Sequence, residues 1–153
     1  MGTFVYIYII TFHSHLMKLL GLDKLNKMAK KNRGNFILTK AIKSFITEIR
    51  NGVWTSQKDL EKSKVKFDCV HSNGFYIADI DKPNRSMVAL TFIETTEIKK
   101  ADNSDKTDNE KEKIKKDLGL VHVLWAGSHD QYLRKFNNKD SITRWLRDKG
   151  KIP

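Results

Sequence analysis

Residues 65–93, VKFDCVHSNGFYIADIDKPNRSMVALTFI, are the stretch that decides the fold. Its apolar residues recur with a period near two, which is typical of strands rather than of helices. The pattern predicts three strands, at residues 65–70, 75–80 and 87–93. Asn-Gly at positions 73–74 suits a tight hairpin turn, and Asp-Lys-Pro-Asn at positions 81–84 is a second turn signal. We therefore expect consecutive antiparallel strands.

Helical patterns precede these strands. Asp23 is placed to cap a helix that runs to about residue 32, with Leu25 and Met28 on one face. A second helix carries an apolar stripe at helical spacing and is closed by Asn51-Gly52. The stripe consists of Ile37, Leu38, Ala41, Ile42, Phe45, Ile46 and Ile49. Together these patterns predict a helical hairpin with basic outer faces.

Further elements follow the central strands. Residues 120–126 are almost continuously apolar, which is typical of a strand paired on both sides. Residues 19–22 have the pattern of a short first strand, and two short helices begin near His129 and near Asp140. This order predicts the α+β class, with an N-terminal helical hairpin packed on a small antiparallel β-sheet and a C-terminal helix.

The composition changes abruptly at two places along the chain. We expect residues 1–16 to be an upstream extension that precedes a natural start at Met17; an extra buried or edge strand is the alternative. Residues 17–153 then form a single domain. Residues 97–117 hold seven basic and seven acidic residues, which predicts a charged loop insertion or a projecting helix near residues 109–116.

The net charge points to a polyanionic partner. The 153 residues include 29 Lys and Arg against 18 Asp and Glu, a formal charge of +11. Such an excess favours nucleic acid or an acidic protein as the partner. The single cysteine fits a reducing compartment, and the apolar run at residues 4–12 is too short to cross a bilayer. We therefore expect a cytoplasmic protein that does not bind membranes.

One segment carries residues suited to acid–base chemistry. His129 and Tyr132 follow the strand at residues 120–126, and their i, i+3 spacing places them on one face if a helix begins there. Cleavage of RNA needs a base for the 2′-hydroxyl, an acid for the leaving oxygen and positive charge at the phosphate. The histidines and the single cysteine form no metal-binding motif, and we expect neither a metal nor a cofactor.

The same segment resembles a known family. The run from Val123 to Tyr132, VLWAGSHDQY, is similar to the strand and Thr-His-x-x-Tyr motif of HigB toxins, with Ser128 in place of threonine. The runs GVWTSQKDL at residues 52–60, GFYIADI at 74–80, VALTF at 88–92 and MKLLGLDKL at 17–25 also resemble that family. HigB toxins belong to the RelE-like group of type II toxin–antitoxin systems, and the resemblance spans residues 17–137.

The resemblance implies a function. It implies a RelE-like fold and a metal-independent endoribonuclease, an mRNA interferase that inhibits translation by cleaving mRNA, usually on the ribosome. It also implies a partner, a HigA-type helix-turn-helix antitoxin. His129 corresponds to the acid/base residue, Tyr132 to its partner and Arg85 to the phosphate-binding arginine. The family pattern places this arginine at the head of the strand, and in KPNRS it stands at a neighbouring position.

Several cations are candidates for RNA phosphates. Lys82, Arg134 and Lys135 lie close in sequence to the candidate catalytic residues, and Lys27 and Lys31 lie on the basic faces of the N-terminal helices. We interpret Trp54, Trp125 and Trp145 as packing residues rather than as surfaces for bases, given their apolar neighbours. The alternative function is a non-catalytic basic module that binds RNA or protein. Convergence of Arg85, His129 and Tyr132 on one concave basic surface would favour the enzyme.

Overall fold

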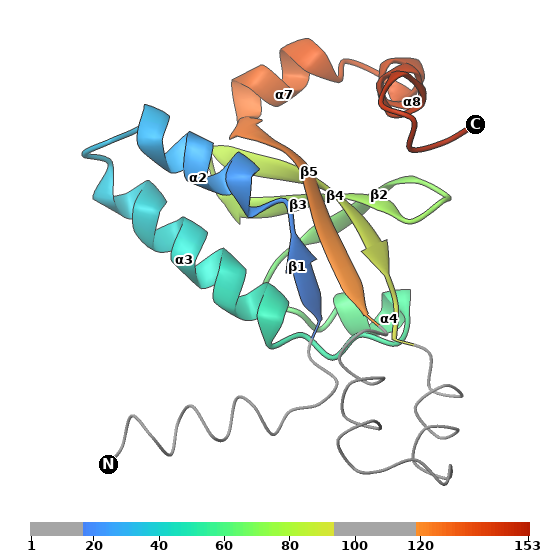
Figure 1. Ribbon diagram of the computed structural model, residues 1–153, viewed down its shortest axis with the longest axis horizontal. Helices are drawn as coiled ribbons and strands as arrows, with labels where there is room; N and C mark the ends of the chain where they lie inside the picture. Colours follow the sequence, from blue (N-terminus) through green and yellow to red (C-terminus); the bar gives the residue numbers. More distant parts are fainter. Residues whose placement is uncertain (1–16, 94–118) are drawn as a thin grey trace, which may run out of the picture.

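The computed structural model describes residues 17–93 and 119–153 (Figure 1). The expected extension at residues 1–16 lies outside the described residues, as do the whole of the charged insertion expected at residues 97–117 and the helix expected within it.

The described chain has the α+β class that the sequence predicts. Its elements in order are β1 (Lys18–Leu20), α2 (Leu22–Lys31), α3 (Phe36–Arg50), α4 (Gln57–Leu60), β2 (Phe67–His71), β3 (Phe75–Asp81), β4 (Asn84–Thr91), β5 (Leu120–Ser128), α7 (His129–Lys135) and α8 (Lys139–Asp148). The five strands form one sheet in the order β1-β5-β4-β3-β2.

The sheet is mixed, so the expectation of an antiparallel sheet is wrong for one strand. β2, β3, β4 and β5 pair antiparallel with their neighbours, whereas β1 pairs parallel with β5 through Lys18 opposite Leu120 and Leu20 opposite His122. β1 and β5 are far apart in the sequence, and local patterns hold no information on the direction in which distant strands pair.

Two cores lie on the two faces of the sheet. The larger core packs α2 and α3 against one face, and the smaller core packs α7 and α8 against the other (Figure 1). In the larger core α2 contacts β5 more extensively than it contacts α3. Of the predicted stripe, Leu38, Ile42, Phe45 and Ile49 are buried. Ile37 is 80% exposed although Leu38 in the same first turn of α3 is buried, because neighbouring residues of a helix point about 100° apart.

The turn into α2 brings that helix close to β5. Gly21 is the N-cap with φ of 82°, so the prediction that Asp23 caps the helix is wrong; Asp23 lies in the first turn and pairs with Lys24 at 3.1 Å. A Cβ atom on residue 21 would overlap the carbonyl oxygen of Val123 in β5. Glycine is therefore required twice, for its positive φ and for the close backbone contact.

None of the helices in the described part of the chain combines the length and the hydropathy that a membrane span requires.

Two glycines separate the effects of conformation and contact. Gly34 also has positive φ, at 94°, but a Cβ there would meet nothing within 4 Å. We expect Gly34→Ala to lower the free energy of unfolding by about 1–3 kcal/mol, the cost of a left-handed conformation in a non-glycine residue. Gly21→Ala should cost clearly more, because the clash with Val123 is added. Urea titration followed by circular dichroism measures both, and equal losses would contradict the close contact.

Candidate functional site

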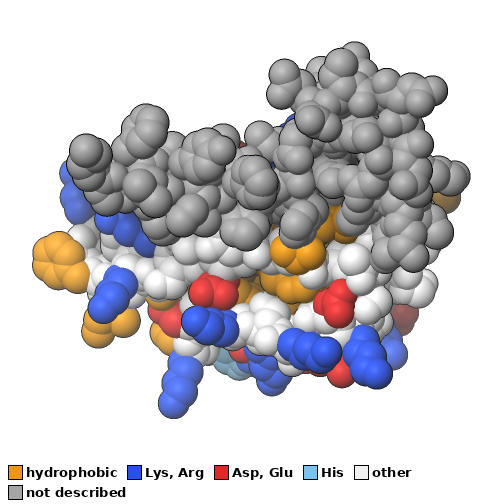
Figure 2. Space-filling model, turned by 90° about the horizontal axis from the view of Figure 1, so that it is seen from below, with side chains coloured by type: hydrophobic (Ala, Val, Ile, Leu, Met, Phe, Trp, Pro, Cys, Tyr) orange, Lys and Arg blue, Asp and Glu red, His pale blue; other side chains and the backbone are white. Residues whose placement is uncertain are grey.

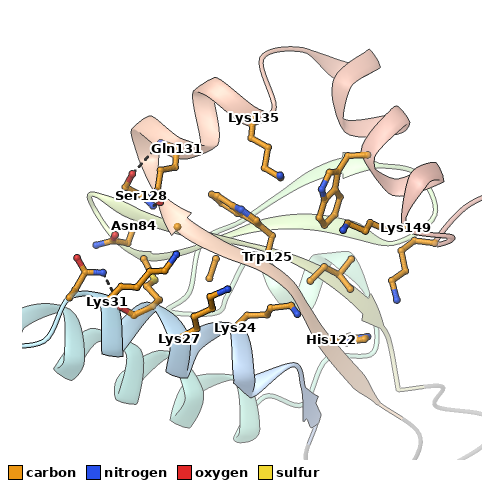
Figure 3. Close-up of a pocket in the computed structure, with 17 residues that line it drawn as sticks. Lys24, Lys27, Lys31, Asn84, His122, Trp125, Ser128, Gln131, Lys135 and Lys149 are labelled. Atoms are coloured by element: carbon orange, nitrogen blue, oxygen red, sulfur yellow. Dashed lines mark hydrogen bonds between the residues drawn. The ribbon is translucent and has the colours of Figure 1, made fainter.

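A groove of about 780 Å³ runs along the second half of β5. One wall is α2, and the other is formed by α7, α8 and the residues after α8 (Figure 3). The floor is the run from Leu124 to Ser128, where β1 no longer covers the outer edge of β5. Among the described residues no strand pairs with that edge, so the backbone of β5 faces the groove.

Six lysines line this groove, and we call it the lysine groove. They are Lys24, Lys27, Lys31, Lys135, Lys149 and Lys151. The first three are spaced i, i+3 and i+7 along α2 and therefore share one face of that helix. In Figure 3 the lysines of α2 and Lys135 of α7 approach from opposite walls. None of the described residues that line the groove is an aspartate or a glutamate.

The charge of the groove differs from that of other surfaces. On the face shown in Figure 2, acidic side chains lie beside lysines and arginines, so opposite charges alternate there. Like charges gathered in a hollow focus the potential and attract an anion more strongly than the same charges spread over a mixed surface. The groove is therefore suited to bind a chain of phosphates or carboxylates.

Aromatic side chains form part of the groove wall. A β-bulge between Met87 and Val88 of β4 leaves Leu124 as an extra residue, and both Leu124 and Trp125 pack toward the α7 and α8 side. Trp125 lies over Gly127, where a Cβ would come within 2.6 Å of the indole ring. Trp145 of α8 also lines the groove. The structure thus adds groove-lining to the packing role predicted for these two tryptophans.

Arg85 and Tyr132 meet on the α7 side of the sheet. The Arg85 Cζ lies 5.5 Å from the centroid of the Tyr132 ring, and the Arg85 Nε lies 3.6 Å from Asp79 Oδ1. Arg85 Nε is buried and makes no hydrogen bond with the described residues. Burial raises the pKa of Tyr132, against a smaller opposing effect of Arg85 and with a further contribution from Asp68. Tyr132 is therefore protonated at neutral pH and able to donate a proton.

His129 begins α7, as the sequence predicts. Its backbone N–H donates to the carbonyl oxygen of Pro83 at 2.7 Å, which ties the helix to the turn before β4. Ser128 caps the helix, and a capping box with Gln131 completes the N-terminus. His129 Nδ1 is buried and has no hydrogen-bond partner among the described residues. The bond to Pro83 thus fixes the backbone of His129.

The predicted site residues fall into two groups. Lys27, Lys31 and Lys135 line the lysine groove. Lys82 and Arg134 are exposed and do not line it, and Arg134 Nε donates to the carbonyl oxygen of Asp130 in its own helix.

The three candidate catalytic residues also lie outside the groove lining. Asn84 and Gln131 line the groove at its rim, which is formed by the turn before β4 and the first turn of α7. Their chain neighbours Arg85 and Tyr132 contact each other on the opposite side of this rim. The structure brings Arg85 and Tyr132 together but does not put them on the basic concave surface itself.

Sequence reasoning missed half of the lysines that line the groove. Lys24, Lys149, Lys151, His122 and Trp145 line it although no local pattern marks them as a set. The i, i+3, i+7 spacing of the α2 lysines was the one signal available for Lys24. The residues after α8 reach the groove only through the packing of that helix.

Neither a metal site nor a known relative identifies the function. Within residues 17–93 and 119–153, no three His, Cys, Asp or Glu side chains are grouped so that they could hold a metal ion. No protein-family model, curated protein or solved structure matches the chain.

His122 lines the groove, so we expect any binding of an anion there to depend on pH. Burial lowers its pKa, and so do Lys151 and Lys24, while Asp23 opposes them. His122 is therefore neutral at pH 7 and gains a positive charge only as the pH falls through its lowered pKa. A bound polyanion favours the charged form, so binding should tighten as the pH falls.

We expect the affinity of the parent protein for oligouridylate to increase when the pH is lowered from about 8 to about 5.5. The affinity of His122→Asn should increase by a smaller factor. Fluorescence anisotropy at constant ionic strength measures the affinity, and circular dichroism confirms the fold at each pH. His71→Asn, in the β2–β3 hairpin outside the groove, is the control and should behave like the parent. An identical pH dependence in His122→Asn would exclude this histidine as the cause.

Proposed function

We propose that this protein binds RNA in the lysine groove and acts as an endoribonuclease toxin of the HigB kind. The observation that carries the proposal is the gathering of six lysines along the outer edge of β5, with no carboxylate among the described residues that line the groove. Phosphate contacts from lysine release counterions from the nucleic acid and supply most of the affinity that does not depend on sequence. The formal charge of +11 adds long-range attraction to the same ligand.

The proposed cleavage uses the three residues beside the groove. His129 accepts the proton of the 2′-hydroxyl, whose oxygen then attacks the adjacent phosphorus. Tyr132, protonated at neutral pH because burial raises its pKa, donates a proton to the leaving 5′-oxygen. Arg85 stabilises the extra negative charge of the phosphorane. The products are a 2′,3′-cyclic phosphate and a 5′-hydroxyl, and no metal takes part.

The biological role follows from the HigB resemblance. We propose that the substrate is mRNA, cleaved on the ribosome, and that a HigA-type antitoxin keeps the protein inactive. The lysine groove offers a negatively charged antitoxin segment the same cations that it offers RNA.

A specific observation favours a second function, a non-catalytic RNA-binding module. Arg85 lies opposite Asp79, so part of its charge is neutralised, and neither it nor Tyr132 lines the groove. For the enzyme, RNA must pass from the groove around the N-terminus of α7 to reach both residues. The binding module needs no such path.

The binding proposal predicts which lysines matter. We expect Lys27→Ala/Lys31→Ala/Lys135→Ala to lower the slope of log affinity against log salt by about 2, since each phosphate contact on a single strand contributes about 0.7. The matched control is Lys30→Ala/Lys40→Ala/Lys43→Ala, which removes the same charge from exposed positions outside the groove. Fluorescence anisotropy with a labelled RNA measures the slope. Equal changes in both variants would mean that RNA does not use the groove.

The cleavage proposal predicts a loss of rate with little loss of binding. We expect His129→Ala to slow cleavage about 10²–10⁴-fold, the usual contribution of a general acid or base. Arg85→Ala should lose rate and some affinity, because its charge acts on substrate and transition state alike. Lys43→Ala, exposed on α3, is the control.

The experiment maps cut mRNAs by primer extension after induction in cells, and repeats cleavage with purified protein and ribosomes. His129→Ala and Tyr132→Phe proteins as toxic as the parent would reject the proposed chemistry. A parent protein that binds RNA in the groove but cuts none with ribosomes present would establish the binding module.

A further inference from the structure

We infer that the lysine groove takes single-stranded RNA and stacks one nucleobase on the indole of Trp145. This inference rests on the proposed binding of RNA in the groove, and it adds the class of RNA and the residue that selects it. In the structure, the indole of Trp145 and the ammonium groups of two lysines occupy the same part of the groove wall.

Two lysines lie over the Trp145 ring. Lys135 Nζ and Lys149 Nζ are each 5.9 Å from the centroid of that ring, and both side chains line the groove. A nucleotide presents a flat base and a phosphate a short distance away, and this cluster offers an aromatic ring with two cations close to it. An exposed contact between a cation and a ring is weaker than stacking of a base on that ring. A base can therefore displace the ammonium groups, which then bind the adjoining phosphates.

The ring is held in position by its packing. Trp145 meets Phe136 edge-to-face at 5.3 Å and 87°, and Phe136 meets Trp125 in the same manner at 5.5 Å and 89°. Phe136 is buried in the smaller core, so the two indoles are fixed from behind. Trp145 itself is half-buried and belongs to the groove wall. A ring that is already ordered loses little further freedom when a base binds.

These features favour a single strand over a duplex. A duplex keeps its bases stacked inside and offers the protein its backbone and groove edges, so it would use the lysines but not the indole. A single strand offers both phosphates and the faces of its bases. The size of the groove agrees, because about 780 Å³ lies within the usual range for pockets that enclose a small ligand rather than a double helix.

The charge alone also suits an acidic segment of a protein, which would lie along the open edge of β5. Such a segment would pair with the backbone and the lysines and would have no flat group to place on Trp145. The indole with two lysines over its ring therefore favours RNA, and an acidic peptide serves as the competing probe.

The experiment compares four probes, the 12-mers oligo(U) and oligo(A), a 12-base-pair RNA duplex and a 12-residue glutamate peptide. We expect both single strands to bind the parent more tightly than the duplex or the peptide does. Trp145→Leu should weaken binding of the single strands about 5- to 150-fold, the range for loss of one stacked base, with the salt slope unchanged. Trp145→Phe, which keeps an aromatic face, should restore most of the affinity.

The outcomes separate this inference from the proposed function. Full affinity in Trp145→Leu, together with a lower salt slope in the groove-lysine variant, would leave RNA binding standing and overturn the stacking. No response to the groove lysines would overturn both. Tighter binding of the glutamate peptide, insensitive to Trp145→Leu, would assign the groove to an acidic protein.

A measurement on the parent protein tests the inference without depending on whether the variants fold. When oligo(U) that contains 5-iodouridine is irradiated, the modified base crosslinks to aromatic rings in contact with it. We expect mass spectrometry to find the adduct on the tryptic peptide Trp145-Leu146-Arg147. Adducts confined to other peptides would overturn the inference, whatever the variants do.

Discussion

The contact between Gly21 and the carbonyl of Val123 is the constraint on which the rest of the structure depends. Because residue 21 has no Cβ and adopts positive φ, the chain turns out of β1 after three residues and enters α2 directly against β5. β1 therefore covers only the first part of β5, and beyond Val123 no strand among the described residues pairs with its outer edge. The same turn brings the lysine face of α2 to that edge, so one backbone contact produces both the floor and one wall of the groove.

The positive charges of the protein lie in two different environments, the lysine groove and the partly buried surroundings of Arg85. In the lysine groove the cations face a hollow whose described lining holds no carboxylate, so their potential is available to a ligand. Arg85 is instead partly buried, with Asp79 opposite and the Tyr132 ring against its guanidinium. A charge in that setting orients groups and responds to local changes in charge, but it attracts a distant polyanion weakly. The first setting suits binding, and the second suits a step in which charge develops at one atom.

The first turn of α7 lies between these settings. Neighbours along a strand point to opposite faces, and neighbours along a helix are about 100° apart. The side chains of Asn84 and Arg85 therefore point in different directions, and so do those of Gln131 and Tyr132. Asn84 and Gln131 line the groove, whereas Arg85 and Tyr132 contact each other. The capping box at Ser128 and the bond from His129 N–H to Pro83 make this rim rigid. Any ligand that uses both sides has to bend around it, because the rim itself is tied to the turn before β4.

The sequence by itself determined the elements, because they follow from local periodicity and turn chemistry. The alternation in residues 65–93 predicted strands that the structure contains, and Gly74 in the β2–β3 turn does adopt positive φ. The apolar spacing in α3 predicted its buried residues, although it also included the exposed Ile37. Lys27, Lys31 and Lys135 were found from charge and proximity.

Only the tertiary structure decided the parallel pairing of β1, the bulge that turns Trp125 into the groove, and the approach of Lys149 and Lys151 from the C-terminus. Each of these depends on contacts between residues distant in the chain, whose energies no local pattern records.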